Sequence, residues 1–280
     1  MSNVAEVISL GTARPFTKWA GGKRQLLHEL RKHVPSTFGK YVEPFVGGGA
    51  LFFDLQPKSA ILADINLNLM AAYKGVRDEL AGVIRLLDLH KILHDRAHYS
   101  KERKLLLIDG EPVGKLANAA ARMIYVNKTC FNGLWRVNKK GGYNVPMGDY
   151  ANPTICDAPG LRAASRALQG TSLFCQGWEK TAELVKAGDF VYFDPPYIPA
   201  TATANFTGYA SGGFDMTEQR KLRDCAAILK YGGAHVLLSN SDTDTTRDLY
   251  AGFPMRRVEA NRSINSAGGK RGAVGEILIW

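Results

Sequence analysis

Residues 40–49 of the chain read Lys-Tyr-Val-Glu-Pro-Phe-Val-Gly-Gly-Gly. The run Lys40–Phe45 predicts a strand, and the glycines after it predict a tight turn into a helix that starts at Ala50. Glycine lets a backbone approach a ligand closely, and the N-terminus of the next helix can bind one. Tight turns also need glycine without any ligand, so this loop alone leaves both interpretations open. A strand that turns in this way into a helix is typical of wound α/β folds.

The same alternation of short apolar runs and helical patterns continues on both sides of a long interruption. We predict further strands at Ala60–Ala63, Ser172–Cys175, Phe190–Phe193, His235–Leu238 and Glu276–Trp280. We predict helices between them at Leu161–Leu168, Thr181–Ala187 and Thr217–Leu229. The stretch 67–156 breaks this rhythm, because it is helical at first and then rich in loops and basic residues. We therefore predict an α/β fold in which residues 1–66 and 157–280 form a Rossmann-like core, with a mainly helical insertion at 67–156.

The composition is that of an ordinary globular chain of 280 residues, 45% hydrophobic and 22% charged. No apolar run approaches the roughly 20 residues that cross a bilayer, and residues 1–14 lack a secretory signal. We therefore expect a cytoplasmic protein without a membrane contact. The six histidines are scattered, which favours core or surface roles over catalysis. The four cysteines are also scattered, which favours reduced, mostly buried thiols over zinc or disulfides: Cys130, Cys156, Cys175 and Cys225.

Basic residues outnumber acidic ones by 36 to 26, and the surplus is concentrated in one part of the chain. Residues 96–140 contain ten lysines and arginines and three acidic residues, which is +7 of the net +10. A solvated basic face would explain a bare charge count. Aromatic and amide side chains interleave with these charges, however, and this favours nucleic-acid binding. They are Tyr99, Tyr125, Asn127, Phe131, Asn132, Trp135 and Asn138.

Asp64 directly follows the predicted strand Ala60–Ala63. An acidic side chain at this place can accept hydrogen bonds from ribose hydroxyls, as in dinucleotide-binding folds. A nicotinamide-dependent dehydrogenase is therefore an alternative. The glycine order differs from G-x-G-x-x-G, and the lead-in through Glu43 and Phe45 suits a cationic sulfonium ligand better than a pyrophosphate. The pattern predicts a cofactor site, and the identity of the cofactor depends on a second motif.

The second motif is Asp194-Pro195-Pro196-Tyr197, directly after the apolar strand Phe190–Phe193. It places a carboxylate and an aromatic ring at the carboxyl end of a strand, where α/β folds bind ligands. The amino nitrogen of adenine is a poor nucleophile because its lone pair is delocalised. Asp194 can accept one N6 hydrogen and the Pro195 carbonyl the other, while Tyr197 stacks on the base. Such chemistry requires neither a cysteine nucleophile nor a metal; a rigid turn at a strand end is the alternative without chemistry.

Eight segments together resemble the Dam-type adenine-N6 DNA methyltransferases, the alpha group of the D12 class. In chain order they are FTKWAGGK at 16–23, VEPFVGGG at 42–49, ILADIN at 61–66, FNGLWR at 131–136, YNVP at 143–146, DPPY at 194–197, ATANFT at 202–207 and RSIN at 262–265. The resemblance runs from Phe16 to the C-terminus. It implies an S-adenosylmethionine-dependent methyltransferase core, an inserted DNA-recognition domain at 67–156, and methylation of adenine N6 in double-stranded DNA.

The resemblance also implies a role for each matching residue. The S-adenosylmethionine site would be lined by Trp19, Lys23, Glu43, Phe45, Gly47, Gly49, Asp64 and Asp194. Catalysis would fall to Asp194, Pro195, Pro196 and Tyr197, without a metal. Contacts to a GATC target or its backbone would come from Lys18, Phe131, Asn132, Leu134, Arg136, Asn144, Pro146, Tyr150 and Arg262. The adenine would leave the base stack to reach Tyr197, and segment 201–209 could close over it.

Side-chain chemistry agrees with part of this set. Arg136 can bond O6 and N7 of guanine, and Leu134 and Pro146 can meet a thymine methyl group. Asp149 departs from the family, in which a basic residue precedes the aromatic residue at this place, and its charge would repel phosphate. Phe131 replaces a frequent tyrosine and so lacks its hydroxyl. The resemblance further implies a cytoplasmic enzyme of a bacterial cell, or of a phage or prophage, with DNA as its partner and no obligate protein partner.

Two more interpretations stay open beside the dehydrogenase. One is an amino-group methyltransferase that acts on RNA or on cytosine N4, which would share the chemistry of Asp194 and Tyr197 but not the recognition segment. The other is a catalytically silent DNA-binding regulator, which would keep the basic insertion and tolerate the loss of both residues.

Overall fold

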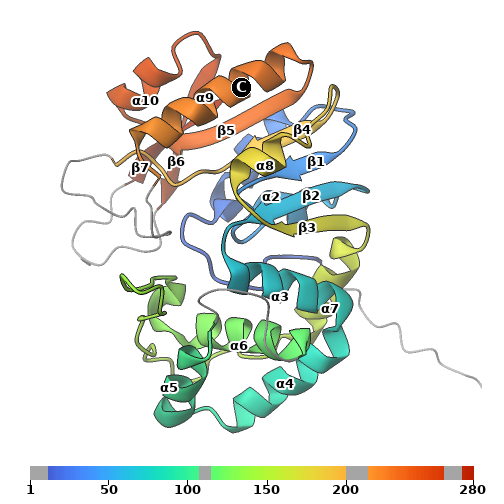
Figure 1. Ribbon diagram of the computed structural model, residues 1–280, viewed down its shortest axis with the longest axis vertical. Coiled ribbons are helices and arrows are strands. Elements are labelled where there is room, and N and C mark those ends of the chain that lie inside the picture. The colour runs from blue at the N-terminus through green and yellow to red at the C-terminus, as the bar shows by residue number, and fades with distance from the viewer. Residues whose placement is uncertain (1–11, 107–114, 200–213, 262–272) are drawn as a thin grey trace, which may run out of the picture.

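The computed structural model describes residues 12–106, 115–199, 214–261 and 273–280. Within them, seven strands form one sheet in the order β3-β2-β1-β4-β5-β7-β6 (Figure 1). Strands β1 to β5 pair in parallel, and β7 is antiparallel to both β5 and β6. The strands are β1 Tyr41–Glu43, β2 Ala60–Asp64, β3 Thr171–Cys175, β4 Phe190–Phe193, β5 His235–Ser241, β6 Met255–Asn261 and β7 Ala273–Ile279.

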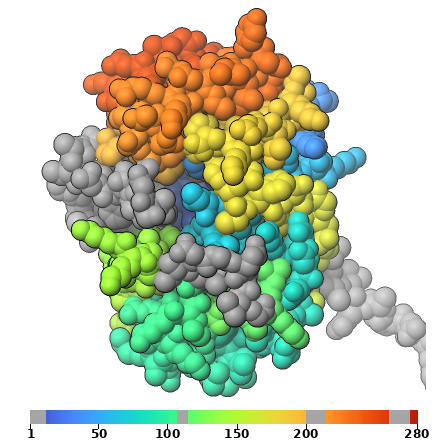
Figure 2. Space-filling model, viewed as in Figure 1, coloured from blue at the N-terminus to red at the C-terminus, as the bar shows by residue number. Residues whose placement is uncertain are grey.

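Helices cover the sheet and continue below it. Residues of α8 (Trp178–Ala182), α9 (Met216–Tyr231) and α10 (Asp244–Leu249) pack against one face of the sheet. Toward the other face lie η1 (Lys23–Leu26), α1 (Leu27–Leu30), η2 (Arg31–His33) and α2 (Ala50–Leu55). A helical layer follows, made of α3 (Leu67–Asp78), α4 (Leu80–Ile92), α5 (Arg96–Lys104), α6 (Leu116–Thr129) and α7 (Ala158–Leu168). In Figure 2, α4 and α5 fill the bottom of the molecule and α9 lies at its top.

The side chains of β4 alternate between the two faces of the sheet, and both faces are buried. Phe190 and Tyr192 belong to one hydrophobic cluster, and Val191 and Phe193 belong to the other. The first cluster continues without a break into buried residues of the helical layer, such as Tyr73. The helical layer therefore shares a core with the sheet. The domain boundaries 66/67 and 156/157 stay a prediction.

The order of strands reverses between β1 and β4. From β1 the chain adds β2 and β3 on one side, and it later adds β4 and β5 on the other. Strands β1 and β4 are direct neighbours, with Tyr41 opposite Phe190. In open α/β sheets, ligands bind outside the carboxyl ends of the strands at such a reversal. The loops that follow Glu43 and Phe193 both start at this place.

Most predicted elements are confirmed to within a few residues, and two predictions need correction. The predicted helix 181–187 lies earlier, as α8, because Trp178 is buried against the sheet and Gly188, with φ 81°, turns the chain toward β4. Strand β6 is absent from the predicted set because its sequence, Met-Arg-Arg-Val-Glu-Ala-Asn, lacks an apolar run. It is an edge strand, where charged side chains are favourable.

The structure shows the burial of the cysteines and the positions of three histidines. The prediction of mostly buried thiols is wrong in part, because only Cys130 is buried, while Cys156 and Cys225 are half-buried and Cys175 is exposed. Three histidines that are separate in sequence gather around Tyr125 in the helical layer: His90, His94 and His98. Among the residues described, no helix has the length and apolar character needed to cross a membrane.

Candidate active site

The glycine loop after β1 depends on backbone conformations that favour glycine. Gly47 has φ 45° and Gly49 has φ 66°, in the left-handed region where other side chains are strained. A Cβ on Gly47 would lie 2.7 Å from Cδ1 of Trp19, and a Cβ on Gly49 would lie 2.6 Å from the Tyr73 hydroxyl. The indole of Trp19 therefore lies directly against the loop, so the sequence prediction that these residues share one site is consistent with their positions.

Asp64, at the end of β2, holds the same loop. Its Oδ2 accepts a hydrogen bond from the Gly47 N–H at 3.1 Å, and its Oδ1 accepts one from the Asn66 N–H at 2.9 Å. Burial raises the pKa of the Asp64 carboxyl to about 6, although these backbone donors oppose the rise. The carboxylate that was expected to meet ribose hydroxyls thus also shapes the glycine loop.

Glu43 and Phe45 lie on either side of the first turn of this loop. Glu43 is 3% exposed and accepts a hydrogen bond from the Tyr41 hydroxyl at 2.9 Å. Burial raises its pKa well above the ordinary value, so it favours a nearby proton or cation. The Phe45 ring packs against Trp178 and Phe214, with ring centroids 6.3 and 5.6 Å away. Together they give the loop one acidic and one aromatic neighbour.

Asp194 follows β4 and is oriented by two donors. Its Oδ1 accepts a hydrogen bond from Ser239 Oγ at 2.9 Å and lies 2.9 Å from Lys23 Nζ. The Lys23 side chain is 4% exposed, and its ammonium also donates to the Gly21 carbonyl at 2.5 Å. Both contacts to Asp194 use the same oxygen. Lys23 and Ser239 therefore fix the orientation of this carboxylate.

Tyr197 is held at both its hydroxyl and its ring. The hydroxyl donates to Glu276 Oε2 at 2.8 Å, and Lys23 Nζ lies 4.8 Å from the ring centroid. Burial, with Asp194 and Glu276 nearby, raises the Tyr197 pKa well above its ordinary value. The hydroxyl therefore stays protonated and remains the donor of this hydrogen bond.

The backbone of the Asp194–Tyr197 motif is fastened to β5 and α9. The Pro196 carbonyl accepts a hydrogen bond from Gln219 Nε2 at 2.8 Å. The Ile198 N–H donates to Asn240 Oδ1 at 3.0 Å, and its carbonyl accepts from Ser241 Oγ at 2.6 Å. These bonds fix the path of the chain before and after Tyr197, as the two prolines do through their restricted φ.

The sequence analysis does not single out Ser239, Asn240 or Glu276. A signal for the first two is present, because a Ser-Asn-Ser run ends β5 after its apolar part, much as Asp64 ends β2 and Asp194 follows β4. The signal for Glu276 is a lone acidic residue in an otherwise apolar strand. A charge retained in such a strand indicates a partner inside the fold.

The predicted DNA contacts divide into two neighbouring groups. Lys18 lies with its ammonium 4.1 Å from the centroid of the Tyr150 ring. Its backbone exchanges two hydrogen bonds with Asn127, both at 2.7 Å, and it packs so closely on Gly133 that a Cβ there would lie 2.4 Å from Lys18 Cβ. Lys18 is thus joined to the 130–150 loop, although more than a hundred residues separate them in sequence.

The second group lies within the 130–150 loop, which two β-bridges fold back on itself. Arg136 Nε donates to Asn144 Oδ1 at 2.8 Å, and the Phe131 N–H donates to the Pro146 carbonyl at 2.9 Å. Phe131 is 47% exposed, Arg136 is exposed, and Leu134 is half-buried. Asn132 adopts φ 53° at the exposed turn. The loop therefore presents an arginine, an amide and apolar side chains at the surface.

Trp135 connects this loop to the glycine loop. Its ring stacks on Trp19 with centroids 6.2 Å apart, and Trp19 in turn covers Gly47. The two groups of candidate residues, for cofactor and for DNA, therefore meet at a pair of tryptophans. Arg262 and the segment 201–209 lie outside the described residues.

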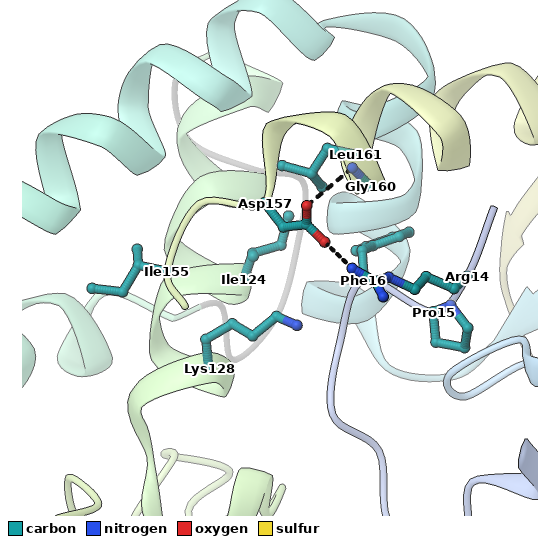
Figure 3. Close-up of a pocket in the computed structure, with 9 residues that line it drawn as sticks. All are labelled: Arg14, Pro15, Phe16, Ile124, Lys128, Ile155, Asp157, Gly160 and Leu161. Carbon is teal, nitrogen blue, oxygen red and sulfur yellow. Dashed lines mark hydrogen bonds and ion pairs between the residues drawn. The ribbon is translucent and has the colours of Figure 1, made fainter. Parts of the chain in front are cut away.

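The segment that leads into Lys18 and Trp19 is anchored at α7. Arg14 Nη2 lies 2.8 Å from Asp157 Oδ2, and Asp157 also accepts a hydrogen bond from the Gly160 N–H at 3.1 Å (Figure 3). Ile124 and Lys128 of α6 line the same small pocket. The pocket is lined by none of the predicted catalytic residues, and we interpret it as an anchor for the segment before Lys18.

One group of described residues has the chemistry of metal ligands, and it lies in the helical layer. The ligand atoms of His90, His98 and Glu102 all lie within 4.8 Å of one another. Glu102 pairs with Arg122 at 2.9 Å, and His90 Nδ1 lies in hydrogen-bond contact with His98 Nε2 at 2.8 Å. Burial lowers the His90 pKa to about 4, so this ring is neutral at physiological pH. The two histidines are therefore paired with each other, and Glu102 is paired with Arg122.

Comparison with known proteins identifies the chain's relatives. Residues 19–264 match the model of the D12 class N6 adenine-specific DNA methyltransferases. The chain is 39% identical over 274 residues to Type II methyltransferase M1.LlaDCHI of Lactococcus lactis subsp. cremoris, covering 95% of this chain and 94% of that protein. It is 40% identical over 286 residues to Type II methyltransferase M.MjaIII of Methanocaldococcus jannaschii (95% and 98%). It is 36% identical over 269 residues to a DNA adenine methylase of Vibrio cholerae serotype O1 (95% of each).

Proposed function

The chain belongs to the D12 class N6 adenine-specific DNA methyltransferase family, and we propose that it methylates GATC sites in double-stranded DNA on an adenine rotated out of the helix. As a family member it is an adenine-specific DNA methyltransferase that takes its methyl group from S-adenosylmethionine. This membership excludes the dehydrogenase alternative. The target sequence, the flipped base and the role of each residue are the parts that we propose.

The observation that carries the proposal is the environment of Asp194. Lys23 and Ser239 both contact Oδ1, which holds the carboxylate in one orientation at the strand reversal. Oδ2 is then placed to accept one hydrogen of the adenine amino group, and the Pro195 carbonyl accepts the other. Two acceptors at fixed positions turn the nitrogen lone pair toward the methyl donor. Asp194 thereby stabilises the transition state of methyl transfer more than it stabilises the bound adenine.

The residues around the glycine loop fit S-adenosylmethionine. The Trp19 indole lies so close to the loop that a Cβ on Gly47 would clash with it, and the Asp64 carboxylate lies at the base of the loop. Glu43 adds a second buried acidic group, which suits a cationic ligand. When bound, S-adenosylmethionine supplies an electrophilic methyl group. The chain's own residues orient the adenine amino group toward that methyl group.

Tyr197 supports the proposal of a flipped base. Lys23 lies over the Tyr197 ring, so the opposite face of the ring would be the one that stacks on adenine. The Asp194 side chain, in the loop that follows β4, is only 21% exposed. A base that stays stacked in the duplex could not bring its amino group to this carboxylate, whereas a rotated base could.

The basic segment and the 130–150 loop support DNA recognition by residues 67–156. Residues 96–140 carry a net charge of +7, which favours binding to phosphates. Arg136, held at Nε by Asn144, can present its remaining donors to guanine, and Leu134 and Pro146 can contact thymine methyl groups. Lys18, with its ammonium over Tyr150, is the second guanine-reading candidate. We propose that these residues, with Phe131, Asn132 and Arg262, select GATC.

Mapping of N6-methyladenine on a plasmid free of that base tests the specificity. We expect modified adenines within GATC, with some modification at sites altered at one outer base pair, because Asp149 places a negative charge beside Tyr150. The Asp194→Asn variant serves as the control for background modification. Modified adenines without a shared A-T core would refute the specificity, and modification of RNA or cytosine alone would refute the substrate.

Base rotation has a separate test. A GATC duplex with 2-aminopurine in place of the target adenine should become more fluorescent when the protein binds, because the base leaves the stack. The same duplex with 2-aminopurine two positions outside the site provides the control. Tight binding without a rise in fluorescence would show that the base stays in the helix.

A further inference from the structure

Glu276 lies beside the proposed catalytic residues although it is 79 residues from Tyr197 in the sequence. It is on β7, opposite Ser241 of β5, and it is 8% exposed. Burying a carboxylate costs free energy unless hydrogen bonds and opposite charges surround it. Glu276 has both, since its Oε2 accepts from the Tyr197 hydroxyl at 2.8 Å and lies 3.9 Å from Lys23 Nζ.

We propose that Glu276 is a positioning residue for methyl transfer, which holds the Tyr197 ring and the Lys23 ammonium in the arrangement that orients Asp194. This inference rests on the function proposed above for Tyr197 and Asp194. Glu276 itself touches neither the adenine nor the methyl group in this scheme. It acts through the two side chains that it contacts.

The Tyr197 ring is restrained at its far end by Glu276. An aromatic ring fixed only at its Cβ can change its rotamer, and stacking on a base depends on the plane of the ring. The bond from the hydroxyl to Glu276 fixes the direction of the ring axis, and the Lys23 ammonium over the ring face restricts rotation about that axis. Asn240 and Ser241 fix the backbone at Ile198 but cannot fix the ring. Glu276 therefore supplies a restraint that the motif itself lacks.

Glu276 also contacts Lys23. Its ammonium lies between two carboxylates, 2.9 Å from Asp194 Oδ1 and 3.9 Å from Glu276 Oε2, and above the Tyr197 ring. The ammonium is held by two carboxylates and the Gly21 carbonyl, and loss of Glu276 would remove one of these restraints. Glu276 therefore helps to hold the Lys23 ammonium in place. Through its contact with Oδ1, Lys23 in turn keeps the Asp194 carboxylate in position while the base enters.

Substitution of Glu276 measures this role directly. Glu276→Ala should lower kcat by about 10- to 100-fold, because preorganised groups near the reacting atoms are lost. The KM values for DNA and S-adenosylmethionine should stay within about threefold of wild type, since uniform binding is not changed. Glu276→Gln keeps an oxygen that accepts from the Tyr197 hydroxyl but loses the charge beside Lys23, so it should recover only part of the lost rate. Glu259→Ala, on the neighbouring strand and 70% exposed, is the control for loss of one acidic residue and should behave as wild type.

A merely structural role would give a different pattern. If Glu276 only stabilised β7, the folded fraction of Glu276→Ala would turn over at the normal rate, and a kcat within about threefold of wild type would overturn the proposal. A loss in Glu276→Gln as large as in Glu276→Ala would overturn the part assigned to the Tyr197 hydroxyl. If Glu276→Ala has no thermal unfolding transition, the comparison is made with Glu276→Gln and Tyr197→Phe.

A double-mutant cycle gives the final test. Because both changes break the same contact, Tyr197→Phe combined with Glu276→Ala should cost less than the product of the two single effects. If the loss in the double variant equals the product of the two single losses, the residues act independently. Tyr197→Ala separates the two proposals: normal turnover in that variant would refute the proposed role of Tyr197. Its inactivity together with a normal Glu276→Ala would refute only the role of Glu276.

Discussion

Replacement of Asp194 by asparagine tests the proposed chemistry with the smallest change of shape. Asparagine keeps the size of the side chain and one oxygen, but it removes the charge that Lys23 meets at 2.9 Å. Lys23 would retain Glu276, at 3.9 Å, as a carboxylate partner. The fold around Lys23 should therefore survive, while the acceptor for the adenine amino group is weakened.

The size of the effect follows from these contacts. A hydrogen bond to a charged group contributes about 1.5–3 kcal/mol, compared with about 0.5–1.5 kcal/mol for a neutral pair. Loss of one preorganised group at the reacting atoms typically costs about 100- to 1,000-fold in kcat, or about 2.7–4 kcal/mol. Asparagine can also turn its NH2 toward the amino group, which would repel it. We therefore expect a loss of at least about 100-fold.

The assay is single-turnover transfer of a labelled methyl group to a duplex with one GATC site, with DNA affinity measured in parallel. DNA affinity should change little, because the basic residues at 96–140 are untouched. Asp224→Asn, exposed on α9 and paired with Arg223 at 2.7 Å, is the control for loss of a charge. Near-normal turnover of Asp194→Asn would refute the proposed role of the carboxylate.

Three further predictions concern the cofactor and DNA. Burial raises the pKa of Asp64 to about 6, so its carboxyl is ionised above that pH. Affinity for the cationic cofactor should therefore rise as the pH increases through about 6. Calorimetry on Asp64→Asn should show weaker cofactor binding without this pH dependence. Arg136→Ala should cost about 1–3 kcal/mol of discrimination at one guanine, as measured by competition between altered sites, and equal losses at every position would contradict base reading. Lys139→Glu with Lys140→Glu should weaken binding to all DNA sequences alike and flatten the dependence of affinity on salt, and an unchanged salt slope would show that this segment does not meet phosphates.

The parts of the fold that the sequence predicts well are those with a strong local pattern. The run Phe190–Phe193 is β4 without any shift, because a central parallel strand is buried on both faces and so is apolar at every position. Strand β6 shows the limit of the same rule. It lies at the edge of the sheet, and Val258 is the one buried residue among those of its residues whose burial is described. Its charged residues interrupt the apolar run by which a strand is recognised in a sequence.

The candidate site divides in the same way. Gly47, Gly49, Asp64 and Asp194 are recognisable in the sequence because each follows a predicted strand, and strand ends are where α/β folds bind ligands. Their partners carry no such mark. Trp19 lies on Gly47, and Lys18 lies on the 130–150 loop, yet nothing in the intervening residues predicts either contact.

The sequence by itself therefore determined the periodic elements, the turns between them and the chemistry available at each strand end, because these depend on neighbours within a few residues. The tertiary structure alone decided which of those groups meet. Lys23, Asp194, Ser239, Tyr197 and Glu276 come together from η1, from the loop after β4, from β5 and from β7. Their contact depends on the order β1-β4-β5-β7, and that order is set by how the strands pair and pack across the whole sheet.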